Sequence, residues 1–242
     1  MYNFEYVCKK ELSPIKNELI SIINEVQNIV RDDFTFSFVF IGSCKRNMVT
    51  YDPKSNIGFD FDVNIEIQRV ARDFSAKETK EMLISAFNKA ARKYGYDYAE
   101  NSTRVITIKV KDFKNSKILH SCDFAIVNNY TDDEGNRRQE YIRYCKKSNS
   151  YCWAKQPDGF YLLPEKAQWI KDNDYQDELR RVYLNKKNRN TDLRQPSRSL
   201  YAQAVNEVCQ RGGYFNEDED EDENENENEN SYSLFPLASP FW

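Results

Sequence analysis

The chain has 242 residues, of which 40% are hydrophobic and 14% aromatic, so it can bury a substantial core. No run of about 18 apolar residues occurs, and the N-terminal segment has neither the apolar centre of a signal peptide nor the Arg- and Ser-rich character of a transit peptide. These features give no sign of a membrane-spanning helix, and we expect a cytoplasmic protein with no membrane partner.

Charge is distributed unevenly along the chain, although the formal net charge is only -4. The segment 216–230 holds ten of the 39 acidic residues, which leaves 35 Lys and Arg against 29 Asp and Glu, a formal +6. A basic body suits an anionic ligand such as a nucleotide or a nucleic acid. The six cysteines form no CxxC pair and there is one histidine, so we expect reduced, packed thiols and no zinc site.

The first elements predicted along the chain are a helix and a buried strand. Apolar residues recur at helical spacing from about Ser13 to Val30. The aromatic and β-branched run 34–41 predicts a strand that ends at Gly42 and Ser43. A short helical turn should follow over about 44–50.

The segment 59–67 alternates between apolar and polar residues. Its aromatic and β-branched residues share one face of a strand, because successive side chains point to opposite faces. The other face carries Asp60, Asp62, Asn64 and Glu66. This pattern predicts a strand with one acidic face.

A second amphipathic helix should begin after Ser75, whose spacing to Glu78 fits a capping box, and should end at Gly95. Two further strands are expected near 104–110 and 117–127, because both segments are rich in β-branched and apolar residues.

The second half of the chain predicts hairpins followed by helices. Turn-forming residues in 128–138 and 148–150 separate the β-rich pieces 140–145 and 151–154. From Pro164 the apolar spacing becomes helical, and the last helical segment runs over about 197–209. The overall pattern predicts a mixed α/β protein of the α+β class.

We therefore expect three parts: a catalytic core over 1–160, a helical region over 161–213 and a disordered acidic tail over 214–242. The tail cannot bury apolar area along its acidic run, and it ends in the apolar sequence SYSLFPLASPFW. It could compete within the molecule for the basic surface, present its apolar tip to a protein partner, or serve only as a solubilising segment.

Three aspartates have the placement that phosphoryl-transfer chemistry requires. Asp60 and Asp62 lie at i and i+2 on one strand, where they could share one magnesium ion or bridge two. Asp123 lies in the apolar run ILHSCDFAIV, where an unpaired charge would be costly and a metal ion would relieve the cost. Strand parity places His120 on the opposite face, so we interpret the single histidine as a structural residue.

A phosphate-binding position is predicted where the first strand ends. Gly42 permits a close approach of the backbone, and the N-H groups that begin a helix attract phosphate. Ser43 can add a hydroxyl, and Lys45 or Arg46 a cation. Each feature alone is a weak signal, because Gly-Ser after a strand is usually a turn and an acidic strand face is usually solvated.

Together, the order strand, Gly-Ser, short helix, Asp-x-Asp strand, helix, strand and Asp-bearing strand resembles the DNA polymerase beta-like nucleotidyltransferase superfamily. The resemblance covers roughly 34–127 and is carried by FVFIGSCKRNMVTYDPKSNIGFDFDVNIEI. It implies that Ser43 contacts a triphosphate and that Asp60, Asp62 and Asp123 hold magnesium, as two ions, with manganese as an alternative.

The helical region, with YLNKKNRN and SRSLYAQAVNEV, is similar to the second half of oligoadenylate synthetases and bacterial cyclic-oligonucleotide synthases. The resemblance implies that Lys186 and Ser199 contact the triphosphate and, by family analogy alone, a role in signalling or antiviral defence. The basic stretch between Arg180 and Arg198 could instead bind RNA or DNA, or be an ordinary solvated helix face.

The leading hypothesis is a magnesium-dependent nucleotidyltransferase that moves a nucleoside monophosphate from a nucleoside triphosphate to an acceptor hydroxyl and releases pyrophosphate. The acceptor stays open among another nucleotide, RNA, a protein and a small molecule, with a nucleotide slightly favoured by the resemblance. The rival hypothesis is a module on the same fold that binds nucleic acid or protein. The presence of all three aspartates favours the enzyme.

Overall fold

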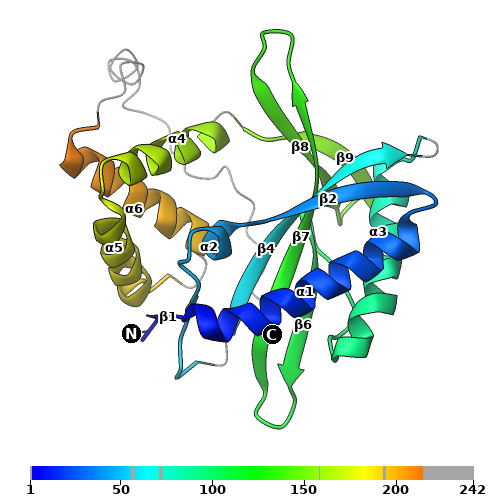
Figure 1. Ribbon diagram of the computed structural model, residues 1–242, viewed down its shortest axis with the longest axis horizontal. Coiled ribbons are helices and arrows are strands. Elements are labelled where there is room, and N and C mark those ends of the chain that lie inside the picture. The colour runs from blue at the N-terminus through cyan, green and yellow to red at the C-terminus, as the bar shows by residue number, and fades with distance from the viewer. Residues whose placement is uncertain (1, 56–57, 71–72, 158, 193–194, 215–242) are drawn as a thin grey trace. The chain divides into compact units, whose positions relative to one another are not determined.

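The computed structural model describes residues 2–55, 58–70, 73–157, 159–192 and 195–214 (Figure 1). The tail prediction lies outside the described residues, apart from Tyr214. The chain forms two compact units, one of Asn3–Gln156 and one of Pro157–Trp242 with Met1–Tyr2. The first unit contains the sheet, and the second contains three described helices.

A mixed sheet forms the centre of the first unit, with strand order β2-β4-β7-β6-β5 and with β8 and β9 continuing from the second half of β7. Strands β4 and β7 are parallel, and the other neighbours are antiparallel. The strands are β2 (Phe34–Ile41), β4 (Phe59–Val70), β5 (Glu100–Asn101), β6 (Val105–Asp112), β7 (Lys117–Thr131), β8 (Arg137–Cys145) and β9 (Ser150–Lys155). The short strands β1 (Glu5–Tyr6) and β3 (Thr50–Tyr51) pair with each other.

Helices α1 (Lys9–Val30) and α3 (Ala76–Ala91) lie across one face of this sheet (Figure 1). Their apolar sides form a single core with the inward side chains of the strands. Fully buried members of this core are Leu19, Ile22, Ile23, Leu83, Phe87, Phe61, Ile65, Ile106, Ile108 and Phe124. Because side chains alternate along a strand, the residues between these positions point to the opposite face of the sheet.

The first helix begins four residues earlier than the predicted start at Ser13. The N-H group of Cys8 donates to the Glu11 carboxylate at 3.2 Å, and the Leu12 N-H donates to the Cys8 carbonyl at 3.2 Å. Pro14 therefore lies inside the helix rather than at its first turn. At this position the proline has no N-H group to donate to the Lys10 carbonyl, so the helix lacks one backbone hydrogen bond there.

The predicted turn over 44–50 is also displaced. Helix α2 covers only Gly42–Lys45, since Asn47 adopts a positive φ of 56° and the chain then enters β3. By contrast, the capping box at the start of α3 is confirmed, because Ser75 Oγ accepts from the Glu78 N-H at 3.2 Å. A short 3-10 turn, η1 (Arg92–Tyr94), precedes Gly95.

The predicted hairpins are present. Strand β7 extends four residues beyond the expected end at Val127 because its second half pairs with β8. In the connecting turn, Asp132 Oδ1 accepts from the N-H of Asn136 at 2.7 Å, and Gly135 takes a φ of 86°. Strands β8 and β9 then form the second hairpin.

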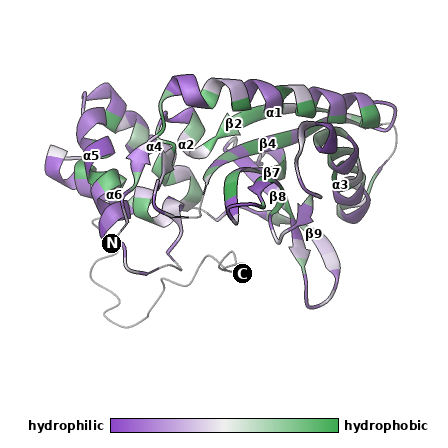
Figure 2. Cartoon of the chain, turned by 90° about the horizontal axis from the view of Figure 1, so that it is seen from below, coloured by the Kyte–Doolittle hydropathy of each residue, from purple (hydrophilic) through white to green (hydrophobic). Residues whose placement is uncertain are grey.

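The second unit contains α4 (Gly159–Asp172), α5 (Gln176–Arg189) and α6 (Ser197–Gly212), so the helical region begins five residues before Pro164. Helix α5 is largely hydrophilic (Figure 2). Tyr183 and Tyr201 pack edge to face at 5.8 Å between ring centroids and join α5 to α6. Among the helices that the structure describes, none is both long and apolar enough to cross a membrane.

Replacement of Phe87 by alanine should destabilise the first unit strongly. Phe87 and Phe124 are fully buried, and their ring centroids lie 4.2 Å apart. We expect Phe87→Ala to lower the free energy of unfolding by about 3–5 kcal/mol, as measured by urea denaturation. Phe113→Ala is the matched control, because Phe113 is 77% exposed. Equal losses in the two variants would contradict this account of the core.

Candidate active site

The sheet face opposite α1 and α3 gathers polar side chains from three adjacent strands. In the parallel pair β4 and β7, Asp62 lies beside Asp123 and Asp60 lies beside Ser121. In the antiparallel pair β6 and β7, Thr107 lies beside Asp123. These five side chains therefore share one face and occupy two neighbouring rows across the sheet. The structure thus brings together the three aspartates that the sequence singled out.

Two hydroxyl groups hold the outer carboxylates of this cluster. Thr107 Oγ1 donates to Asp123 Oδ1 at 2.6 Å. Ser121 Oγ donates to Asp60 Oδ1. Hydrogen bonds to a carboxylate stabilise its charged form and fix its orientation. Each of these aspartates therefore has one oxygen positioned by a neighbouring strand.

The carboxyl group of Asp123 has a perturbed acidity. Burial raises its pKa to about 7, the hydrogen bond from Thr107 opposes the rise, and the carboxylates of Asp60 and Asp62 add to it. Asp123 retains partial exposure, but protein atoms surround its carboxyl group closely enough to weaken its hydration. A divalent cation would reverse both the burial cost and the repulsion between carboxylates.

Glycine is required at the end of β2. Gly42 has a φ of 61°, and a Cβ atom there would lie 2.1 Å from Asp62 Oδ2. The backbone of α2 therefore approaches the Asp62 carboxylate more closely than any side chain would permit. Ser43 follows in α2 and is half-buried, and Lys45 is exposed at the end of the same helix. Cys44 also lies here, although the sequence did not indicate it. Burial raises the pKa of its thiol, the charge of Lys16 opposes the rise, and the charge of Asp62 adds to it.

The donor set fits magnesium or manganese in chemical type, because carboxylate oxygens are the ligands that these hard cations prefer. The side chains are not yet gathered around one point: in the part of the chain that the structure describes, no three His, Cys, Asp or Glu groups form a metal-binding cluster. Asp60 is turned toward Ser121. Coordination would require its carboxylate to rotate toward the other two, and the charge of the cation would offset the added repulsion among the three carboxylates.

The single histidine is structural, as predicted. His120 is 8% exposed and lies on the core side of β7. Its Nε2 atom is 2.9 Å from the Tyr96 hydroxyl, and its ring stacks on Phe59 at 5.9 Å. Burial lowers the pKa of its imidazole, which favours the neutral ring.

Lys186 and Ser199 belong to the second unit. The ammonium group of Lys186 on α5 forms an ion pair with Glu207 at 2.7 Å and lines a groove between α5 and α6. Ser199 lies in the first turn of α6, where its N-H donates to the Pro196 carbonyl at 3.0 Å. Within the described residues, the structure does not bring these two side chains into a common cavity.

Thr107, Ser121 and Lys109 belong to the site region but were not recognised in the sequence. Lys109 lies beside Ser121, forms an ion pair with Glu100 at 2.8 Å, and lowers the pKa of Asp123. The alternating pattern of β6 shows which of its residues share a face. It does not show which strand lies beside β6, because that depends on the order of strands in the sheet. A prediction that β6 pairs with β7 in this register would have identified all three.

Comparison with known proteins indicates a fold. No protein-family model matches the chain, and no curated protein is significantly similar in sequence. The cyclic AMP-GMP synthase DncV of Vibrio cholerae, in complex with a nonhydrolyzable GTP, matches with a TM-score of 0.54 at 14% identity over 84% of this chain and 68% of that chain. The CdnE c-UMP-AMP synthase of Rhodothermus marinus matches with a TM-score of 0.50 at 14% identity over 79% and 69%.

These similarities confirm the α+β class and the nucleotidyltransferase fold that the sequence resemblance implied. A GTP-bound form of the Vibrio cholerae protein also matches, with a TM-score of 0.50 at 18% identity over 84% of this chain and 52% of that chain. The chain spans 52% to 69% of the length of these three solved structures.

The contact between Gly42 and Asp62 gives a testable requirement. Gly42→Ala should displace the Asp62 side chain or the start of α2 and lower the free energy of unfolding by about 1–3 kcal/mol. Gly135→Ala is a matched control, because Gly135 also has a positive φ but a Cβ atom added there would have no neighbour within 4 Å. Thermal denaturation of both variants separates steric conflict from backbone strain. Equal destabilisation would contradict the close approach of Gly42 to Asp62.

The raised pKa of Asp123 predicts a pH dependence of stability in the absence of divalent cations. Since the folded-state pKa of about 7 exceeds the ordinary value of 3.8, the folded state prefers the protonated carboxyl group. The favourable contribution of this carboxyl group to the free energy of unfolding is complete below about pH 4 and is lost as the pH rises through 7. We expect the free energy of unfolding to fall by about 2–4 kcal/mol between pH 4 and pH 8, relative to Asp123→Asn. The same pH dependence in both proteins would contradict this assignment.

Proposed function

We propose that this chain transfers a nucleoside monophosphate from a nucleoside triphosphate to an acceptor hydroxyl, with magnesium held by Asp60, Asp62 and Asp123. The observation that carries the proposal is the register of β4 and β7, which places these three carboxylates on one sheet face beside the backbone of Gly42. The shared fold with cyclic-nucleotide synthases supports the same reaction class.

The chemistry requires one bond to form and one to break. The acceptor oxygen attacks the α-phosphorus, the bond from that phosphorus to the bridging oxygen of pyrophosphate breaks, and the acceptor proton leaves. Bound magnesium would neutralise charge on the phosphate oxygens. Asp60 and Asp62 would hold the magnesium that orients the triphosphate, and Asp123 would also receive the acceptor proton.

The geometry of Asp123 suits that role. Thr107 donates to Oδ1 and so fixes the orientation of the carboxyl group. Thr107 acts on the reaction through Asp123 and is a positioning residue.

The triphosphate end of the substrate would lie along α2. Gly42 lets the backbone approach, Ser43 offers its hydroxyl, and Lys45 adds a positive charge at the exposed end of the helix. The formal +6 of the chain outside its acidic segment favours attraction of the anionic substrate.

We place another nucleotide first among the acceptors, because the proteins of similar fold are described as synthases of cyclic AMP-GMP and c-UMP-AMP. RNA, protein and small-molecule hydroxyls are the alternatives. A nucleotide product would fit a signalling role in antiviral defence. A cytoplasmic location stays a prediction from the sequence.

The proposal is tested with purified protein, magnesium or manganese, and each α-labelled ribonucleoside triphosphate, alone and in mixtures, with and without RNA. Asp60→Asn, Asp62→Asn and Asp123→Asn should each lower product formation at least about 100-fold, since each removes charge that stabilises the transition state. Chromatography of phosphatase-treated products would identify the acceptor class.

Glu66→Gln is the matched control, because it removes a carboxylate from the same strand and the same side of β4, two alternations beyond Asp62. It should retain activity, and circular dichroism should be unchanged in all four variants. Full activity in any of the three aspartate variants would refute the metal assignment. Binding of nucleic acid without turnover by the native protein would favour the binding-module hypothesis.

A further inference from the structure

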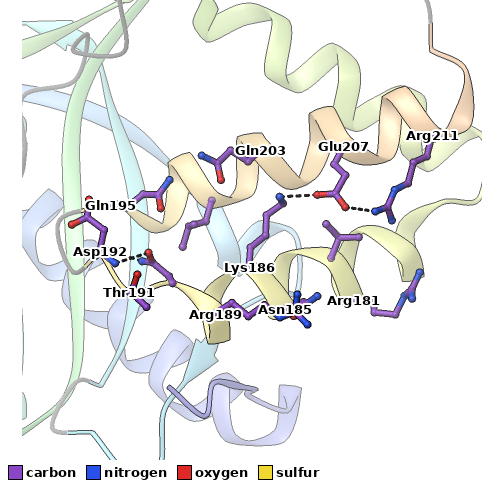
Figure 3. A pocket seen from close by; sticks show the side chains of 13 residues that line it. Arg181, Asn185, Lys186, Arg189, Thr191, Asp192, Gln195, Gln203, Glu207 and Arg211 are labelled. Atoms are coloured by element: carbon purple, nitrogen blue, oxygen red, sulfur yellow. Dashed lines mark hydrogen bonds and ion pairs between the residues drawn. The ribbon is translucent and has the colours of Figure 1, made fainter. Parts of the chain in front are cut away.

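The second unit contains a polar groove that the proposed reaction does not explain. It lies between α5 and α6 and has a volume of about 640 Å³ (Figure 3). Its cationic side chains are Arg181, Lys186, Arg189 and Arg211. Both helices belong to one compact unit, so the groove is complete within that unit.

Ion pairs organise one wall of the groove. Glu207 lies between two cations, at 2.7 Å from Lys186 and at 2.5 Å from Arg211 (Figure 3). Glu178 accepts from Arg211 at 3.3 Å and lies 3.6 Å from Arg181. These pairs hold the cationic side chains in place along the helices.

Positive charge exceeds negative charge in the lining. Four cationic residues line the groove, against the two acidic residues Asp192 and Glu207. Cations in the last turn of a helix stabilise its dipole, which accounts for Lys186 and Arg189 on α5. The same effect does not account for Arg181, which lies earlier in α5 and has 75% of its side chain exposed.

The end of α6 fixes where the following chain leaves the unit. A Cβ atom on Gly212 would lie 2.7 Å from the Trp169 ring, so the helix end packs tightly against α4. The Tyr214 N-H donates to the Cys209 carbonyl at 2.9 Å, and its ring contacts Trp169 edge to face at 5.2 Å. The chain therefore leaves from an anchored residue, three positions after Arg211 of the groove.

We propose that this groove binds the acidic segment 217–229 of the same chain. Ten carboxylates occur within this segment, and no basic residue interrupts them. Glu217 follows Tyr214 by three positions along the chain, a span of up to about 10 Å, and each later carboxylate can reach further. The segment thus complements the groove in charge and follows it closely along the chain.

Tethering makes this interaction effective. A single exposed ion pair is weak and is screened by salt. A segment joined to the unit by a few residues has an effective concentration in about the millimolar range, and several carboxylates can exchange among the cations. Occupation by the acidic segment would keep polyanions such as nucleic acid off this surface. The groove and the carboxylate cluster belong to different units, and the proposal goes beyond nucleotidyl transfer.

The test uses the full chain and does not depend on catalysis. In a tail-neutral variant, the ten acidic residues of 217–229 are replaced by Gln and Asn. The probe is a fluorescein-labelled peptide of residues 215–230, and binding is followed by fluorescence anisotropy. We expect the tail-neutral variant to bind this peptide at least about tenfold more tightly than the native chain, because its groove is free of the tethered competitor.

Charge reversal locates the site. In the tail-neutral variant, the double substitution Arg181→Glu and Arg189→Glu should abolish peptide binding. The control is the double substitution Lys147→Glu and Lys171→Glu, which changes the charge equally at exposed lysines outside the groove and should preserve binding. Added salt should weaken binding. In the native chain, a photo-crosslinking residue at position 224 should attach within the same molecule to residues 177–211.

Three results would overturn the proposal. The first is equal peptide binding by the native and tail-neutral proteins. The second is loss of binding in the lysine control to the same degree as in the groove variant. The third is binding of a labelled oligonucleotide, but not of the acidic peptide, by the tail-neutral variant, which would make the groove a nucleic-acid site. Crosslinks found only between different molecules would show that the segment binds the groove of another molecule and not its own.

Discussion

The parallel pairing of β4 with β7 is the interaction on which the candidate site depends. It places Asp62 directly beside Asp123 and Asp60 one row away. Three like charges so close together are unfavourable by themselves: burial raises the pKa of Asp123 most, and repulsion from Asp60 and Asp62 adds to the rise. The opposite face of the same strands supplies the compensation, because Phe61 and Phe124 are fully buried against the helices. A slip of one residue would expose those rings and bury the carboxylates, so the core enforces the arrangement that the chemistry uses.

The same pairing explains the demand for glycine at the end of β2. Strand β2 is the antiparallel neighbour of β4 on the other side, and Ile41 lies beside Asp62. The next residue must turn the chain across the Asp62 carboxylate, and Gly42 does so with a positive φ and no side chain. The Gly-Ser signature and the Asp-x-Asp signature are thus two parts of one steric contact. The sequence alone showed only that the two motifs occur in a certain order, and this contact explains physically why they occur together.

Much of the fold and the central part of the site could be predicted from the sequence, because both depend on short-range patterns. Alternation in 59–67 identified the acidic face of β4, and parity within β7 separated His120 from Asp123. Helix starts were less predictable, because the start of α1 is set by the hydrogen bond between Cys8 and Glu11 rather than by the Ser-Pro pair. Thr107 and Ser121 were missed because their roles arise from neighbours on other strands.

The two units use charge in opposite ways. In the first, acidic groups converge on a sheet face whose geometry is fixed by a large apolar core, so a cation is the natural partner and its binding would relieve repulsion. In the second, cations line a groove between two helices and are held by Glu178 and Glu207. The acidic segment that follows the last helix is opposite in charge to that groove. Because each charged surface is built within its own unit, the chain can alter access to its basic groove without rearranging the strands that carry Asp60, Asp62 and Asp123.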